Sequence, residues 1–135
     1  MKNDKIAELL RVIKESLDML REYQDVKLTD YRRDRRTQDI VEREFERAIL
    51  ACADIGARII SLRRFPPASS YVEIFDILSQ KDVLPSQLAE VMKDLVRFRN
   101  VLVHEYFRID PELVYKKLQD ELETLVEFGR CVEKL

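Results

Sequence analysis

One short stretch of this sequence holds most of the side chains that could do chemistry. It reads RFRNVLVHEY and contains the only histidine of the chain, His104, with Arg97, Arg99, Asn100 and Tyr106. A histidine can take up and release a proton near neutral pH, and an arginine can hold a phosphate group through charge-assisted hydrogen bonds. The stretch is therefore the candidate of this sequence for proton transfer by His104 and for the binding of a negatively charged group by an arginine.

The spacing of these residues limits which of them can act together on one helix. Asn100 lies on the side of His104, and Arg97 lies about 20° from His104 around the axis. Arg99 lies about 140° from His104 and about 7.5 Å along the axis, and Tyr106 falls on the side of Arg99. Arg99 and His104 could converge only through the length of the arginine, a bend, or pairing with a second copy of the helix.

Each of these residues also has an ordinary structural explanation. A lone histidine on a helix is usually a surface or hydrogen-bonded residue, and the arginines beside it are usually solvated. Tyr106 could equally lie at the rim of the core with its hydroxyl in water. The residues alone leave open whether the stretch is catalytic and whether Arg97 or Arg99 is the functional arginine.

A second basic cluster follows Tyr31. It contains four arginines in five residues: Arg32, Arg33, Arg35 and Arg36. Such a cluster could contact an RNA backbone, bind an acidic partner, or form the solvated start of a helix. Arg63 and Arg64 form a similar but weaker candidate.

The periodicity of apolar residues predicts the helices that must position these side chains. Long helices are expected over about 4–24, 29–62 and 84–109, with a fourth after Asp110-Pro111 and a short one beginning after Ser70. Four long helices and one short one predict an all-α, up-and-down bundle. With 135 residues, the chain is expected to form a single domain, residues 1–135.

Local signals within these helices make further predictions. Ser70 followed by Glu73 is a capping-box pattern, and Asp110 before a proline is an N-cap pattern. Cys52 falls on the apolar stripe of the second helix, which predicts a buried and inert thiol. Gly56 and neighbouring small residues on that helix would let another helix approach closely.

The composition excludes several classes of protein. The net charge of −2 gives no global attraction to nucleic acid, so any RNA contact must come from a local basic patch. One histidine and two cysteines do not make a zinc site or a disulfide framework. The sequence contains no apolar run near the ~18 residues that span a bilayer, and its start is unlike a signal peptide. We therefore expect a cytoplasmic protein without membrane contact, metal or cofactor.

Residues 99–106, RNVLVHEY, resemble the R-x4-H-x-Y motif of HepT-like toxins in the HEPN superfamily. The resemblance covers nearly the whole chain, because those proteins are similar in length, all-helical, and carry the motif on a late helix followed by one more. The longer R-N-x-L-V-H-x-Y form is much more specific than R-x4-H alone. Arg97 also fits the looser R-x6-H spacing of the superfamily.

This resemblance implies a metal-independent endoribonuclease toxin of a type VII-like toxin–antitoxin pair. It places Arg99 and His104 as catalytic residues at a homodimer cleft, where two chains supply two histidines. Asn100 would orient His104 or bind phosphate, and Tyr106 would contact phosphate or base. The tyrosine matching Tyr106 is also where an MntA-type nucleotidyltransferase antitoxin attaches AMP. The expected partners are thus RNA, a second copy of the chain and this antitoxin.

Two further hypotheses come from other classes of protein. The chain could be a non-catalytic subunit that binds nucleotide or substrate for a minimal nucleotidyltransferase, or a purely structural dimer. Tight nucleotide binding without RNA cleavage would favour the first of these, and motif variants that change only stability would favour the second.

Overall fold

The computed structural model describes residues 3–135, and the regular secondary structure in that range is all helical. The all-α prediction is therefore confirmed, although the helices are more numerous than expected. The seven α-helices and one 3-10 helix of the described residues are α1 (Asp4–Glu22), α2 (Leu28–Tyr31), α3 (Arg35–Leu62), α4 (Tyr71–Gln80), α5 (Ser86–His104), η1 (Tyr106–Arg108), α6 (Pro111–Asp120) and α7 (Leu122–Glu133).

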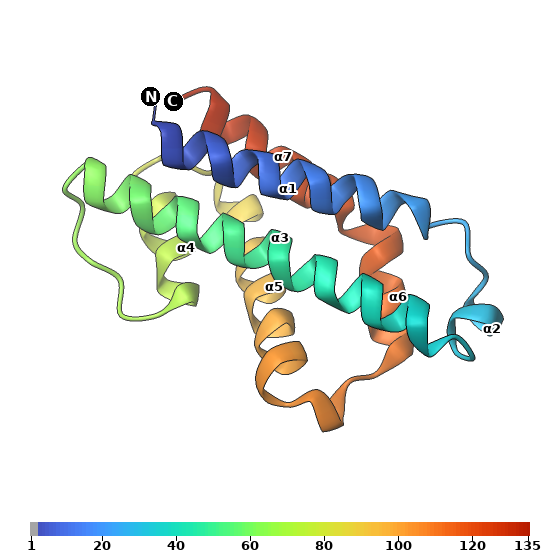
Figure 1. Ribbon diagram of the computed structural model, residues 1–135. Helices are drawn as coiled ribbons and strands as arrows, with labels where there is room; N and C mark the ends of the chain where they lie inside the picture. The colour runs from blue at the N-terminus through green and yellow to red at the C-terminus, as the bar shows by residue number, and fades with distance from the viewer. Residues whose placement is uncertain (1–2) are drawn as a thin grey trace.

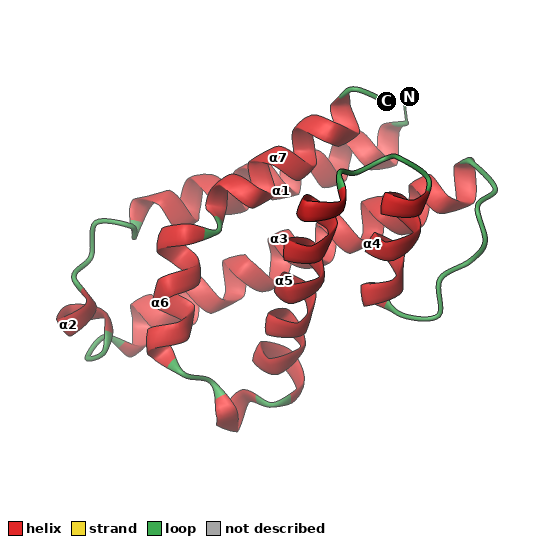
Figure 2. Cartoon of the chain, turned by 180° about the vertical axis from the view of Figure 1, so that it is seen from behind, coloured by secondary structure: helices red, strands yellow, loops and turns green. Residues whose placement is uncertain are grey.

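The helices form two sets that cross one another. Helices α1, α3 and α7 run along the long axis of the molecule, whereas α4, α5 and α6 cross it more steeply (Figures 1 and 2). Helix α3 packs against α1, α4, α5, α6 and α7, so it is the central element. The apolar stripe expected on α3 is buried from Val41 to Ile59, and only its last member, Leu62, is exposed.

Helices α4 and α6 start at the predicted capping residues, and α1 starts at a cap that was not predicted. Asn3 caps α1 by accepting hydrogen bonds from two backbone N–H groups of its first turn, and Asp110 caps α6 ahead of Pro111. Ser70 caps α4 by accepting from the Glu73 N–H. The Glu73 carboxylate, however, accepts from the N–H and hydroxyl of Ser69 instead of returning to Ser70. The capping box is thus shifted by one residue, which ties the incoming loop to the helix.

The long helix expected over 29–62 is interrupted after one turn. Asp34 has an extended backbone and accepts hydrogen bonds from the Thr37 N–H and hydroxyl, so it is the N-cap of α3. The amide of Gln38 donates to the carbonyl oxygens of Tyr31 and Arg32 and holds the preceding turn, α2, against this start. A short polar residue that competes for backbone hydrogen bonds explains the break.

The other two expected helices are also shorter than the periodicity indicated. Helix α5 ends at His104 instead of near residue 109, because the chain must reverse before Asp110 can cap α6. The last helix divides at Glu121, which has φ −110° and ψ 0°. This break lets α6 pack against α2 and α3 while α7 packs against α1 and α5.

Gly56 fixes the distance between α3 and α4. A Cβ atom built at this position would lie 2.4 Å from Cγ2 of Ile74, which is closer than two carbon atoms can pack. The prediction of a close helix approach at the small residues of α3 is therefore confirmed. This approach sets the position of the first turn of α4, where Tyr71 lies.

Within residues 3–135, no helix is long and apolar enough to cross a membrane.

Candidate functional site

Arg99 lies on α5 in an unusual environment for an arginine. Its guanidinium carbon is 5.6 Å from the centre of the Tyr71 ring, which comes from the start of α4. Its Nε–H is buried and has no acceptor, and one terminal nitrogen donates to the amide oxygen of Asn100 at 3.4 Å. None of the ion pairs within residues 3–135 involves Arg99. The aromatic face and the free donors make Arg99 a site that is ready to bind an anion.

Arg97 has the opposite environment, although it is only two residues away. Its guanidinium is exposed and pairs with Asp94, one turn earlier on α5, at 2.9 Å. It also lines a hollow of about 260 Å³ between α5 and α6, together with Phe98, Arg108 and other residues. Arg97 and Arg99 therefore face different neighbouring helices, as the helical projection predicts.

His104 is the last residue of α5 and is exposed to solvent. Arg99 and His104 both lie within the regular part of α5, so their predicted separation of about 140° holds on this helix. Asn100, one turn before His104, is half-buried and accepts from Arg99. In a single chain, the structure thus brings Arg99 to Tyr71 and Asn100, while the imidazole remains open to solvent.

The prediction that Tyr106 shares the Arg99 side of one continuous helix is wrong. Glu105, with φ −131° and ψ 45°, ends α5, and Tyr106 begins the separate helix η1. The orange segment after α5 projects from the body of the molecule (Figure 1). Tyr106 is consequently 74% exposed, and Phe107 beside it is 71% exposed.

The arginine cluster after Tyr31 is partly engaged in ion pairs. Arg32 pairs with Glu112 of α6, and Arg35 pairs with Asp39 one turn further along α3. Arg33 and Arg36 are exposed. The cluster lies around the start of α3, where two of its four arginines are already paired with carboxylates.

The two thiols and the described carboxylates give no second site. Cys52 is fully buried, and burial raises the pKa of its thiol above the ordinary value, in agreement with the prediction of an inert residue. Cys131 is half-buried, and its pKa is also raised, chiefly by burial. No group of three potential metal ligands is found among residues 3–135.

Sequence reasoning missed Tyr71 and Phe107. Tyr71 is the first residue of the short helix predicted after Ser70; it is exposed, and its ring lies against Arg99. Its role depends on how closely α4 and α5 pack, which no local pattern reveals. Phe107 directly follows the motif. Its exposure was not anticipated, because the helix was expected to continue through it to about residue 109.

Comparison with known proteins identifies relatives over nearly the whole chain. A protein of Aphanizomenon flos-aquae named tRNA nuclease HepT is 31% identical over 127 residues, covering 94% of this chain and 86% of that protein. A protein of Shewanella oneidensis named mRNA nuclease HepT is 27% identical over 127 residues, covering 93% of this chain and 94% of that protein.

A solved structure has nearly the same fold. It is described as a tri-AMPylated Shewanella oneidensis HEPN toxin in complex with MNT antitoxin, and it aligns with a TM-score of 0.92 at 24% identity. The alignment covers 99% of this chain and 100% of that chain. The family model described as ribonuclease HepT-like matches residues 13–132, and the chain therefore belongs to the HepT-like family.

Proposed function

We propose that this protein is a metal-independent endoribonuclease toxin of a type VII-like toxin–antitoxin pair. One observation carries the proposal: the guanidinium of the half-buried Arg99 is held against the Tyr71 ring without a carboxylate partner. An arginine without a counterion binds a phosphate more readily than one already neutralised by a carboxylate. The names of the two relatives, an mRNA nuclease and a tRNA nuclease, support RNA as the substrate.

The chemistry follows from the residue types. The 2′-hydroxyl of the RNA attacks the adjacent phosphorus, its proton passes to a histidine, and the 5′-oxygen leaves with a proton from a second acid. The products are a 2′,3′-cyclic phosphate and a 5′-hydroxyl end. His104 is the proton carrier, and Arg99 stabilises the non-bridging oxygens as their charge grows. Asn100, already hydrogen-bonded to Arg99, positions the guanidinium or binds the phosphate.

A second copy of the chain completes this site. Arg99 and His104 point about 140° apart on one α5, and each chain has only one histidine. The region around them also exposes apolar side chains, a feature that marks interaction surfaces. These exposed residues are Tyr71, Val103, Tyr106 and Phe107. We propose that two copies meet here, so that the cleft between them holds both imidazoles and both guanidiniums, with the His104 of each chain beside the Arg99 of the other.

A nucleotidyltransferase antitoxin of the MntA type is the proposed partner. The structural relative forms a complex with an MNT antitoxin and is AMPylated. Tyr106 is the proposed acceptor here, because its ring is 74% exposed on the projecting helix η1. An AMP group at this position adds negative charge beside the proposed phosphate site and would repel RNA.

The test measures cleavage of cellular RNA by the purified parent protein and by the variants Arg99→Ala and His104→Ala. Each variant is expected to lose RNA cleavage by at least about a hundred-fold, the usual effect of removing a charge-stabilising or proton-transferring group. Cleavage by the parent should vary between about pH 5 and 8, the range over which histidine exchanges its proton. If both variants cleave as the parent does, the proposal is wrong.

The same experiment distinguishes the ribonuclease from the non-catalytic alternative. A protein that binds nucleotide tightly but cleaves no RNA between about pH 5 and 9 would be a binding subunit of a nucleotidyltransferase. In that case Arg99→Ala would weaken nucleotide binding and leave no cleavage to measure. Motif variants that alter stability without altering binding would instead favour the structural dimer.

A further inference from the structure

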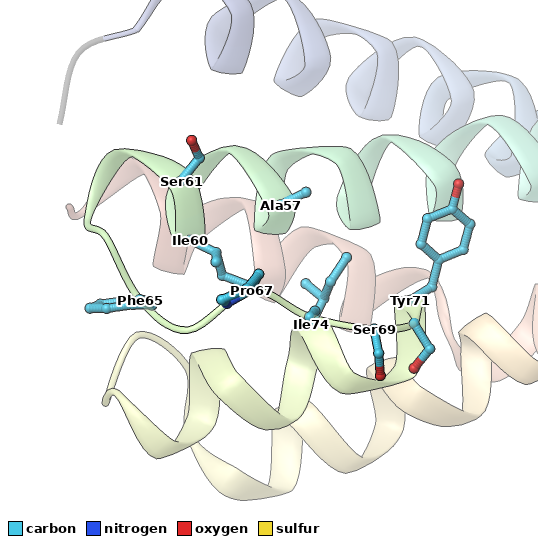
Figure 3. A pocket seen from close by; sticks show the side chains of 10 residues that line it. Ala57, Ile60, Ser61, Phe65, Pro67, Ser69, Tyr71 and Ile74 are labelled. Carbon is cyan, nitrogen blue, oxygen red and sulfur yellow. The ribbon is translucent and has the colours of Figure 1, made fainter.

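A cavity of about 480 Å³ lies between the end of α3 and the start of α4, and one of its lining residues contacts Arg99. Tyr71 connects the cavity to Arg99, because Tyr71 lines the cavity and its ring contacts the Arg99 guanidinium. Figure 3 shows Ile60 of α3 pointing toward Pro67 of the loop, with Ile74 of α4 beside them and Tyr71 at one end of the row, whereas the hydroxyl of Ser61 points away from the loop. The cavity therefore opens within one side chain of the proposed phosphate site.

The lining of the cavity matches the chemistry of a nucleobase. Its walls are apolar and include the rings of Phe65 and Pro67, and no charged side chain lines it. Ser69 and Ser70 also line it: the Ser69 hydroxyl donates to the Glu73 carboxylate and the Ser70 hydroxyl accepts from the Glu73 N–H. A hydroxyl bonded once in this way can still take a second partner, such as a base edge. Bases combine an apolar face with a polar edge, so they stack on aromatic rings and bond to such groups.

The charges outside the cavity match the backbone of RNA. Residues 57–74 carry three basic side chains, Arg58, Arg63 and Arg64, against one acidic side chain, Glu73. The carboxylate of Glu73 is already engaged by Ser69. All three arginines are exposed, and Arg58 lines a hollow that adjoins the uncharged cavity, so basic groups that can meet phosphates lie outside it.

A second hollow extends the cavity away from Arg99. It has a volume of about 460 Å³, shares Ala57 and Ser61 with the first, and is also lined by Lys5, Arg58 and Asp54. A strand whose phosphate lies at Arg99 could thus place a base in the first cavity and continue past Lys5 and Arg58.

The loop that closes the cavity is already fixed in this chain. Its start is held by a hydrogen bond from the Phe65 N–H to the Ile60 carbonyl at 3.0 Å, and Arg64 has a positive φ of 55°. Two prolines follow, which restrict the backbone, and the Ser69–Glu73 hydrogen bonds hold its end. A preformed cavity binds a ligand without first ordering a loop.

We propose that this cavity binds one unpaired base of a single-stranded RNA next to the phosphate held by Arg99. The proposal rests on the ribonuclease function proposed above, and it names a residue set, the Phe65–Tyr71 loop with the last two turns of α3, that selects where the RNA is cut.

The test fills the cavity at Ala57, an exposed residue of α3. Ala57→Met is compared with Ala7→Met, the same change at an exposed position of α1 outside the cavity. Both variants are made with His104→Ala so that RNA is bound but not cut. The probes are short single-stranded RNAs of adenylate, cytidylate or uridylate, and copies in which one nucleotide at a time lacks its base.

The proposal predicts one strand position at which removing the base weakens binding to the protein with intact Ala57 by at least about five-fold. Ala57→Met should weaken binding of the intact strand by a similar factor. The Ala57→Met protein should then bind the intact strand and the strand without that base equally well. Ala7→Met should do neither. If Ala57→Met fails to fold, Ser61→Leu fills the same cavity from the next turn of α3.

Two results would overturn the proposal. Equal RNA binding by the Ala57→Met and Ala7→Met proteins would show that no base enters the cavity. A change of oligomeric state in Ala57→Met, with RNA binding unchanged, would show that a second protein chain covers it. Both results are separate from the proposed function, which is tested by RNA cleavage by the parent and its loss in the Arg99→Ala and His104→Ala variants.

Discussion

At the scale of single residues, Arg97 and Arg99 illustrate how environment assigns a role. Both are arginines on α5, and both fit a spacing found in the wider superfamily. Arg97 is exposed and neutralised by Asp94, and exposed ion pairs of this kind contribute little to stability or binding. Arg99 is half-buried against Tyr71 and has a free donor. The structure therefore favours Arg99 as the functional arginine, a choice that the sequence left open.

Substitution of the two arginines gives a direct prediction. Arg99→Ala should lower the RNA cleavage rate by at least about a hundred-fold, whereas Arg97→Ala should change it by less than about three-fold. The cleavage rate of Arg99→Lys should fall between those of the two alanine variants, because lysine keeps the charge but not the planar set of donors of the guanidinium. The measurement is the initial cleavage rate at equal protein concentration. A loss with Arg97→Ala as large as that with Arg99→Ala would contradict the assignment.

At the scale of helices, the position of the site depends on how closely α4 packs on α3. Gly56 permits that approach, and the approach places Tyr71 over Arg99. Gly129 on α7 is a natural contrast, because a Cβ atom there would meet only Leu10 at an ordinary distance of 3.9 Å. The same substitution at the two glycines should therefore have opposite effects.

We predict that Gly56→Ala lowers the free energy of unfolding by about 1–3 kcal/mol, the usual penalty for overpacking a core. Gly129→Ala should raise it by about 0.5–1 kcal/mol, since alanine is the better helix former and the site has room. Urea unfolding of both variants measures the two values. A stabilising Gly56→Ala substitution would mean that α4 does not lie against α3 as described.

Asp34 gives a prediction of pH dependence at the start of α3. Hydrogen bonds from the Thr37 hydroxyl and N–H lower the pKa of its carboxyl group. A lowered pKa in the folded state stabilises the protein above the unfolded pKa, and this contribution is lost as the pH falls through the folded value. Asparagine caps a helix about as well but does not titrate.

The stability of the parent relative to Asp34→Asn should therefore be greater at about pH 6 than at about pH 2.5. Urea titrations of both proteins at the two pH values give the comparison, and the other carboxylates cancel because both proteins contain them. A difference that stays constant with pH would show that the Asp34 carboxylate does not cap α3.

The helices also show what could be predicted from sequence. The apolar stripes located the core of α3 and of the last two helices, because burial of one face imposes a period near 3.6 residues. Cap residues located the starts of α4 and α6. The breaks at Glu105 and Glu121 could not be predicted, because neither residue forbids a helix and the breaks arise from the path of the chain. The contact between Tyr71 and Arg99 could not be predicted for the same reason.

At the scale of the whole molecule, the account depends on assembly. The exposed motif end of α5 and the projecting η1 leave His104 and Tyr106 at the surface of one chain. A surface imidazole separated from the guanidinium that it should assist is a poor catalytic pair by itself. Two associated copies would bring the His104 of one chain toward the Arg99 of the other, in a cleft that excludes water.

The most direct test mixes two inactive proteins. Arg99→Ala and His104→Ala variants with different affinity tags are co-expressed, and complexes that carry both tags are purified and assayed for RNA cleavage. The account predicts that these mixed complexes cut RNA clearly faster than either variant alone, because one chain supplies the histidine and the other the arginine. Replacing the His104→Ala chain with the Arg99→Ala/His104→Ala double variant should abolish the gain. Mixed complexes that form but stay as inactive as their parts would contradict a shared site.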